Sequence, residues 1–162
     1  MRLSIFTVSS VPYRVYLIGM STTAPLDAGV LIELPRDQAK TFFSTKGDAA
    51  VLEFVQHMLA DENTNCLNTE GAWKELADAF GDEPPMAWCF TAGRPMHPGD
   101  SHNIMLIRPD MVGHVATNLS EATLSDLAGE SHVSILEKLR DHFDAAAKAG
   151  SCLLYTSDAA DE

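Results

Sequence analysis

The sequence predicts an α+β fold, a single small domain in which helices pack on a short mixed or antiparallel sheet. The chain has 162 residues, which is the size of one ordinary domain. Hydrophobic residues make up 46%, enough for a self-sufficient core. Segments with helical spacing outnumber strand-like segments, and the two kinds do not alternate strictly, which disfavours a doubly wound parallel sheet.

The first half of the domain is expected to hold one strand and three helices. Residues 29–34 form an apolar run with β-branched side chains, which predicts a strand. Pro35 suits the first turn of a short helix that reaches Phe43. Apolar residues three and four positions apart predict a second helix over 49–59 and a third after Thr69, whose hydroxyl can cap it.

The second half is expected to hold two strands followed by helices. Residues 86–91 and 103–107 are apolar runs that predict strands, and the Gly- and Pro-rich segment 93–100 predicts a loop between them. Pro109 begins a helix with a short continuation. The final helix is expected over 131–150, with the terminal glycine as its stop.

The charge of the chain limits its partners. Lys and Arg number 11 against 23 Asp and Glu, a formal net charge of −12. Such a chain repels phosphate, and it has no basic stripe, so no nucleic-acid partner is expected. No apolar window approaches the ~18 residues of a membrane helix, so we expect no membrane association. An acidic surface suits a basic protein partner.

The two ends of the chain differ from its body. Residues 152–162 resemble the in-frame translation of a sequencing-library adapter. On that interpretation residues 151–162 are a non-native tail, and the domain lacks its closing strand. Residues 1–27 form an N-terminal extension with two interpretations. They are either two short strands or the product of a start site placed too early, with Met20 as the true start.

Four short motifs occur in an order that resembles that of the YfbM-like domains of unknown function. They lie at residues 67–76, 92–95, 106–112 and 135–150. The resemblance covers about residues 28–150 and implies a small bacterial cytosolic α+β domain whose long last helix precedes a closing strand. It implies no reaction, so no catalytic residue is assigned from it.

The Gly- and Pro-rich loop carries residues of metal-ligand type. His97, Asp100 and His102 supply two imidazoles and a carboxylate, which suit zinc or iron. Their spacing matches no standard motif, and the favoured interpretation is a solvated polar loop that holds no metal or cofactor. The alternative is a small metal-dependent hydrolase that uses this loop.

Three further side chains are candidate binding residues. Arg94 and Arg108 are scarce positive charges on either side of the expected hairpin. They suit an anion or a partner's carboxylate, or else an internal ion pair with nearby acids. Trp88 lies in an expected strand and can face either the core or a partner.

The favoured function is a non-enzymatic protein-binding module with an acidic surface, for instance an immunity protein that neutralises a toxin. The sequence contains no phosphate-binding glycine motif and no nucleophile elbow. Enzymatic activity is therefore not expected, with the metal-dependent hydrolase as the exception. A homo-oligomer is a third possibility.

Overall fold

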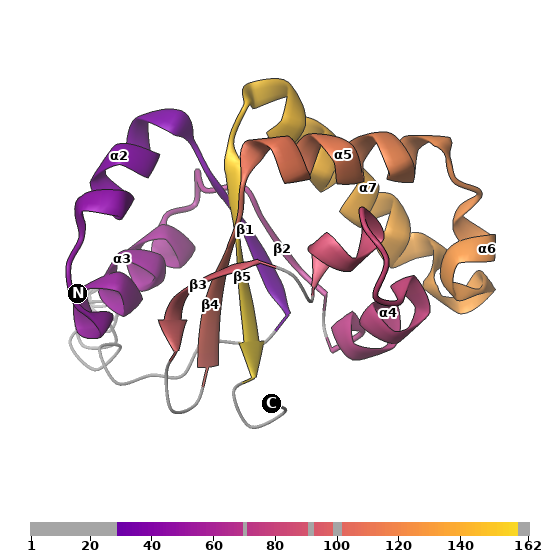
Figure 1. Ribbon diagram of the computed structural model, residues 1–162, viewed down its shortest axis with the longest axis horizontal. Coiled ribbons are helices and arrows are strands. Elements are labelled where there is room, and N and C mark those ends of the chain that lie inside the picture. Colours follow the sequence, from indigo (N-terminus) through magenta and orange to yellow (C-terminus); the bar gives the residue numbers. More distant parts are fainter. Residues whose placement is uncertain (1–28, 70, 91–92, 99–101, 159–162) are drawn as a thin grey trace, which may run out of the picture.

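The computed structural model describes residues 29–69, 71–90, 93–98 and 102–158. Within these residues the protein is a single α+β domain, with a five-stranded sheet between two layers of helices (Figure 1). The fold class is as predicted from the sequence. The two interpretations of residues 1–27 lie outside the described residues.

The sheet is antiparallel throughout, with the strand order β2-β1-β5-β4-β3. The strands are β1 (Val30–Leu34), β2 (Cys66–Asn68), β3 (Arg94–Pro98), β4 (His102–Ile107) and β5 (Cys152–Asp158). Because β1 and β4 both pair antiparallel with β5, they run in the same direction on either side of it. Both therefore end at the same edge of the sheet.

Helices cover both faces of the sheet (Figure 1). One face carries α2 (Arg36–Ser44) and α3 (Asp48–Ala60). The other carries α4 (Trp73–Phe80), α5 (Pro109–Glu121), α6 (Leu124–Ala128) and α7 (Val133–Ala149), with two 3₁₀ turns, η1 (Met86–Cys89) and η2 (Glu130–His132). Among the described helices, none is long and apolar enough to cross a bilayer.

Successive side chains of the central strands point to opposite faces of the sheet and so contribute to both hydrophobic cores. Leu31 of β1 and Leu153 of β5 pack into the cluster under α5 and α7. Their neighbours Ile32 and Leu154 pack into the cluster under α2 and α3. All four side chains are fully buried, as expected for strands covered on both faces. The central strands thus join two hydrophobic cores into one domain.

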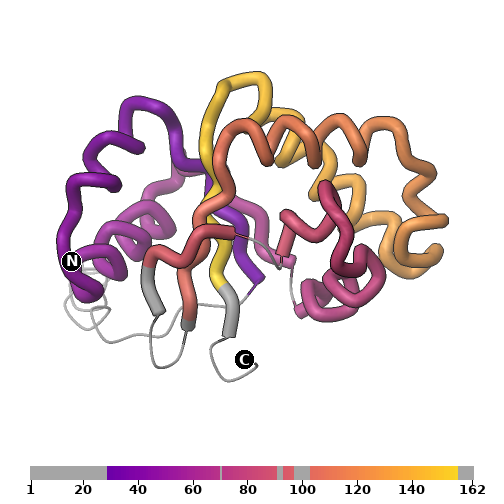
Figure 2. Tube along the Cα trace, viewed as in Figure 1, coloured from indigo at the N-terminus to yellow at the C-terminus, as the bar shows by residue number. Residues whose placement is uncertain are grey.

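The expectation of a missing closing strand is wrong. Residues Cys152–Asp158 form β5, which lies at the centre of the sheet between β1 and β4 (Figure 2). Gly150 ends α7 in the left-handed conformation, with φ of +68°, and turns the chain into this strand. Whatever the origin of these residues, their apolar, aromatic and β-branched side chains suit a buried strand.

Two elements between residues 86 and 98 also differ from expectation. The segment predicted as a strand forms the 3₁₀ turn η1, because a short apolar run fits a buried turn as well as a strand. The segment predicted as a loop contains β3, which among the described strands pairs with β4 alone. Pro95 and Pro98 are tolerated there because an edge strand does not need every backbone N–H for pairing.

The start of β1 is held by a residue expected to act as a helix cap. Thr69 is buried, and its hydroxyl donates a hydrogen bond to the carbonyl oxygen of Gly29 at 2.8 Å. Its backbone N–H donates to the same oxygen at 3.0 Å. The N-cap of α4 is Ala72. Thr69 therefore stabilises the junction between β2 and β1 rather than the helix.

The core also contains a histidine, which makes the stability of the fold depend on pH. His142 of α7 is 5% exposed, and its Nε2 has no hydrogen-bond partner among the described residues. Burial lowers the pKa of His142 to about 4, despite the opposing effect of the Glu33 carboxylate. The pKa of a histidine in an unfolded chain is about 6.5. The unfolded chain therefore binds more protons between these two values, so stability falls as the pH falls.

We expect the free energy of unfolding to drop by about 3 kcal/mol from pH 7 to pH 4 through this residue. Urea denaturation measured across that range checks the slope. His142→Leu should make the curve flatter, and the matched change His57→Leu, at an exposed histidine of α3, is the control. Equal slopes in the wild type and His142→Leu would contradict this explanation.

Candidate ligand pocket

The edge where β1 and β4 end is the place where the fold leaves a crevice. One strand, β5, separates them, so their ends lie about 10 Å apart at ~4.8 Å per strand spacing. From this edge β1 leads into α2 on one face, and β4 leads into α5 on the opposite face. Helices that diverge in this way open a space beyond the strand ends, as they do at the strand ends of α/β sheets.

A cavity of about 410 Å³ occupies this position. Its walls come from the ends of β1 and β4, the first residues of β3 and β5, one side of α2 from Arg36 to Phe43, the start of α5, and Gly150 after α7. The volume is within the ~300–1,000 Å³ range of small-molecule sites. We call it the arginine pocket, after Arg36, Arg94 and Arg108, which all line it.

Arg36 is tied to the fold on one side of the arginine pocket. Its Nε donates a hydrogen bond to the carbonyl oxygen of Gly150 at 3.3 Å. Gly150 directly follows the last turn of α7, where the helix dipole is negative and favours a cation. The guanidinium is therefore held against the end of α7 while the side chain remains exposed.

Arg108 forms an ion pair inside the same pocket. Its Nε and Nη2 donate to the two carboxylate oxygens of Asp110 at 3.1 and 2.8 Å. The hydrogen bond from Arg108 holds the pKa of Asp110 below its usual value. The internal ion pair, one of the two alternatives for this arginine, is therefore present, although both side chains are largely exposed.

Arg94 differs from the other two arginines. It begins β3, opposite Leu106 of β4, and its side chain is exposed. In the part of the chain that the structure describes, no acidic group forms an ion pair with it. With Asp110, the three arginines give the pocket a net charge of +2 in a chain of −12.

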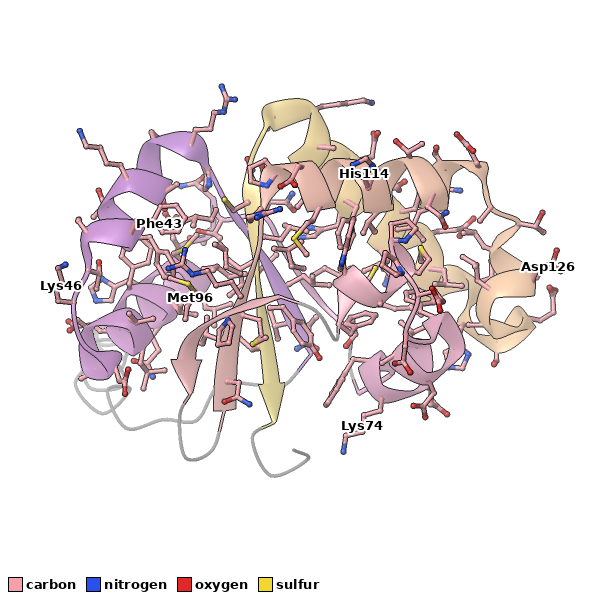
Figure 3. All side chains as sticks on the ribbon, in the orientation of Figure 1. Phe43, Lys46, Lys74, Met96, His114 and Asp126 are labelled. Atoms are coloured by element: carbon pink, nitrogen blue, oxygen red, sulfur yellow. The ribbon has the colours of Figure 1, made fainter. Side chains whose placement is uncertain are left out.

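The rest of the arginine pocket is apolar. Leu34, Leu106 and Cys152 line it and are buried at the ends of their strands. Phe43 of α2 lines it as well and is 47% exposed. Among the described residues it is the only large hydrophobic side chain that is exposed, and Figure 3 shows it on α2. A cationic rim and an apolar wall therefore meet in one cavity.

Trp88 lies away from the pocket that contains Arg94 and Arg108. It lies in η1, half-buried against the cluster under α5 and α7, on the other face of the sheet from Phe43. Its ring centroid lies 5.9 Å from that of His114 on α5. The structure therefore gives Trp88 a packing role and separates it from the arginine pocket.

The candidate metal loop lies partly outside the described residues. His97 and His102 belong to β3 and β4, but their side chains and the whole of Asp100 lie outside the described residues. His102 begins β4, and Arg108 follows its end about 20 Å away at ~3.3 Å per residue. Elsewhere in the described ranges, no three His, Cys, Asp or Glu side chains are grouped to hold a metal ion. The metal site stays a prediction.

Two residues of the arginine pocket, Arg36 and Phe43, were not found from the sequence. A signal for Arg36 existed, because both strands enter their helices through a proline next to an arginine. The pairs are Pro35-Arg36 and Arg108-Pro109. This local similarity becomes informative only once β1 and β4 are known to end at the same edge.

Comparison with known proteins found no relative of this chain. No protein-family model matches the chain, and neither a curated protein nor a solved structure matches it. The function is therefore inferred from the residues of the arginine pocket and from the charge of the surface.

Proposed function

We propose that this chain is a binding domain whose arginine pocket holds an anionic group of its ligand. One observation carries the proposal. Three of the 11 basic residues gather around a single cavity although the chain has a net charge of −12. Guanidinium groups that line one cavity repel one another, and a bound anion relieves that repulsion while accepting paired hydrogen bonds.

The chemistry of the pocket suits recognition better than catalysis. An arginine stays protonated at neutral pH and does not act as a general base. Asp110 is already paired with Arg108, and burial raises the pKa of the Cys152 thiol, which disfavours a reactive thiolate. These groups can bind and orient a ligand, which is sufficient for the proposed binding function.

A second candidate function rests on the opposite end of the molecule. Segments 75–93 and 111–137 contain eight acidic residues and no Lys or Arg. They supply α4, α5 and α6, where η2 meets α4 through His132 and Glu75, with 3.3 Å between Nε2 and Oε1. Figure 3 shows Asp126 of α6 far from Phe43. This acidic surface favours a basic protein partner, the role expected of an immunity-like module.

We also propose that the chain is related to the YfbM-like domains and is a bacterial cytoplasmic protein. The order of the four sequence motifs supports this. A strand after the last long helix, which that resemblance implies, is consistent with it. A metal-dependent hydrolase at the His97, Asp100 and His102 loop is the remaining alternative, and metal analysis of untagged protein tests it.

The proposed function predicts weak binding of simple anions to the wild-type protein. We expect acetate and inorganic phosphate, added at constant ionic strength, to shift NMR resonances around the arginine pocket. Arg94→Ala should weaken binding by about tenfold, the value of one charge-assisted hydrogen bond. Lys46→Ala is the matched control, since it removes one positive charge at an exposed residue that does not line the pocket. Equal affinities in both variants would overturn the proposal.

A further inference from the structure

We infer that the ligand of the arginine pocket is a carboxylate attached to a single apolar group, such as an aromatic ring or a branched alkyl chain. The inference rests on the proposed function and specifies its ligand. Two sources share this chemistry, a free organic acid and the C-terminal residue of a peptide. The experiment below separates them.

The apolar group is indicated by the position of Phe43. Its neighbour Phe42 is 1% exposed and packs in the core, whereas Phe43 is 47% exposed and lines the pocket. The two rings meet edge to face with 5.8 Å between centroids, so the buried ring supports the exposed one. An aromatic side chain held at the rim of an apolar cavity offers a surface that a hydrophobic ligand group can cover.

The charge of the head group follows from the state of the three arginines. Arg108 is already paired with Asp110, and Arg36 is tied through Nε to Gly150. Only Arg94 has no ion pair or side-chain hydrogen bond to a described residue. One carboxylate, with two oxygens in a plane, matches the fork of one guanidinium. The Asp110 carboxylate lines the same cavity and repels a head group with two negative charges.

The cavity leaves room for an apolar group beside the carboxylate. Its volume of about 410 Å³ lies within the ~300–1,000 Å³ range of small-molecule pockets. Leu34, Leu106 and Cys152 give this space an apolar floor. A ligand that places its carboxylate at Arg94 can therefore rest its apolar group between this floor and Phe43.

The test is a matched ligand series titrated into the full chain by NMR and calorimetry at constant ionic strength. The ligands are acetate, 3-phenylpropionate, its neutral amide and inorganic phosphate. We expect 3-phenylpropionate to bind at least about tenfold more tightly than acetate and phosphate, and its amide to bind far more weakly. Phe43→Ser should remove the gain over acetate while leaving acetate binding intact. Arg94→Ala should weaken both acids.

A short peptide ending in phenylalanine, with a free or an amidated C terminus, identifies the source. Binding of the free-carboxylate peptide at least as tight as that of 3-phenylpropionate assigns a peptide C terminus, and weaker binding assigns a free acid. If acetate and phosphate bind but the phenyl group adds nothing, or if phosphate binds most tightly, the inference fails and the proposed function stands. If none of the anions binds, both fail.

Discussion

A chain that ends at Ser151 will not form a stable domain, because it lacks the strand that joins the two halves of the sheet. β5 pairs with β1 on one side and β4 on the other. Leu153, Leu154 and Tyr155 of this strand are at most 1% exposed. Losing one such side chain costs about 2–5 kcal/mol. Losing all three removes an amount comparable with the ~5–15 kcal/mol that stabilises a whole domain.

Circular dichroism and thermal unfolding of the truncated chain check this expectation. The matched control is a chain that ends at Asp158, which retains β5 and should unfold cooperatively like the full chain. Cooperative unfolding and a dispersed NMR spectrum for the chain ending at Ser151 would show that β5 is dispensable. That result would favour the interpretation of residues 151–162 as a tail outside the domain.

Single substitutions can then show how β5 contributes to each core. Leu153 lies in the cluster under α5 and α7, whereas Leu154 lies in the cluster under α2 and α3. The truncation removes both contributions together. Leu153→Ala and Leu154→Ala separate them, which tells whether one core can persist without the other.

Helices and two of the strands could be predicted because their signals are local. Apolar residues three and four positions apart predict α3, α5 and α7, and short apolar runs with β-branched residues predict β1 and β4. β5 was missed for a different reason. The resemblance of residues 152–162 to a translated adapter assigned them to a tail outside the domain. Burial at the centre of a sheet depends on pairing partners more than 100 residues away, which no local window contains.

The candidate site was predictable only in part. Arg94 and Arg108 stood out as rare positive charges, and they do line one cavity. Arg36 and Phe43 join them because β1 lies two places from β4 in the sheet, an order that the sequence does not state. Trp88 was proposed as a strand residue, and the 3₁₀ turn places it on the other face. Tertiary arrangement, rather than residue type, thus decides which candidates meet.

Gly29→Ala should cost about 3 kcal/mol or more of folding stability, because the start of β1 has no room for a methyl group. Gly29 has a φ of +80°, where a side chain is strained by roughly 1–2 kcal/mol. An added Cβ would lie 2.5 Å from the Oγ1 of Thr69 and closer still to the ring of Trp73. Both residues are held in place, Thr69 by its hydrogen bonds to Gly29 and Trp73 by its edge-to-face contact with Tyr155.

Urea denaturation of Gly29→Ala and Gly47→Ala separates strain from contact. Gly47, the N-cap of α3, has a similar φ of +90°, but nothing lies within 4 Å of the Cβ position, so Gly47→Ala should show a loss of stability without a steric contact. The difference between the two variants measures how tightly β1 packs against Thr69 and Trp73. Equal losses of stability would mean that these two side chains move aside freely. The junction of β1, β2 and α4 would then be loose, and Thr69 would not be the residue that fixes it.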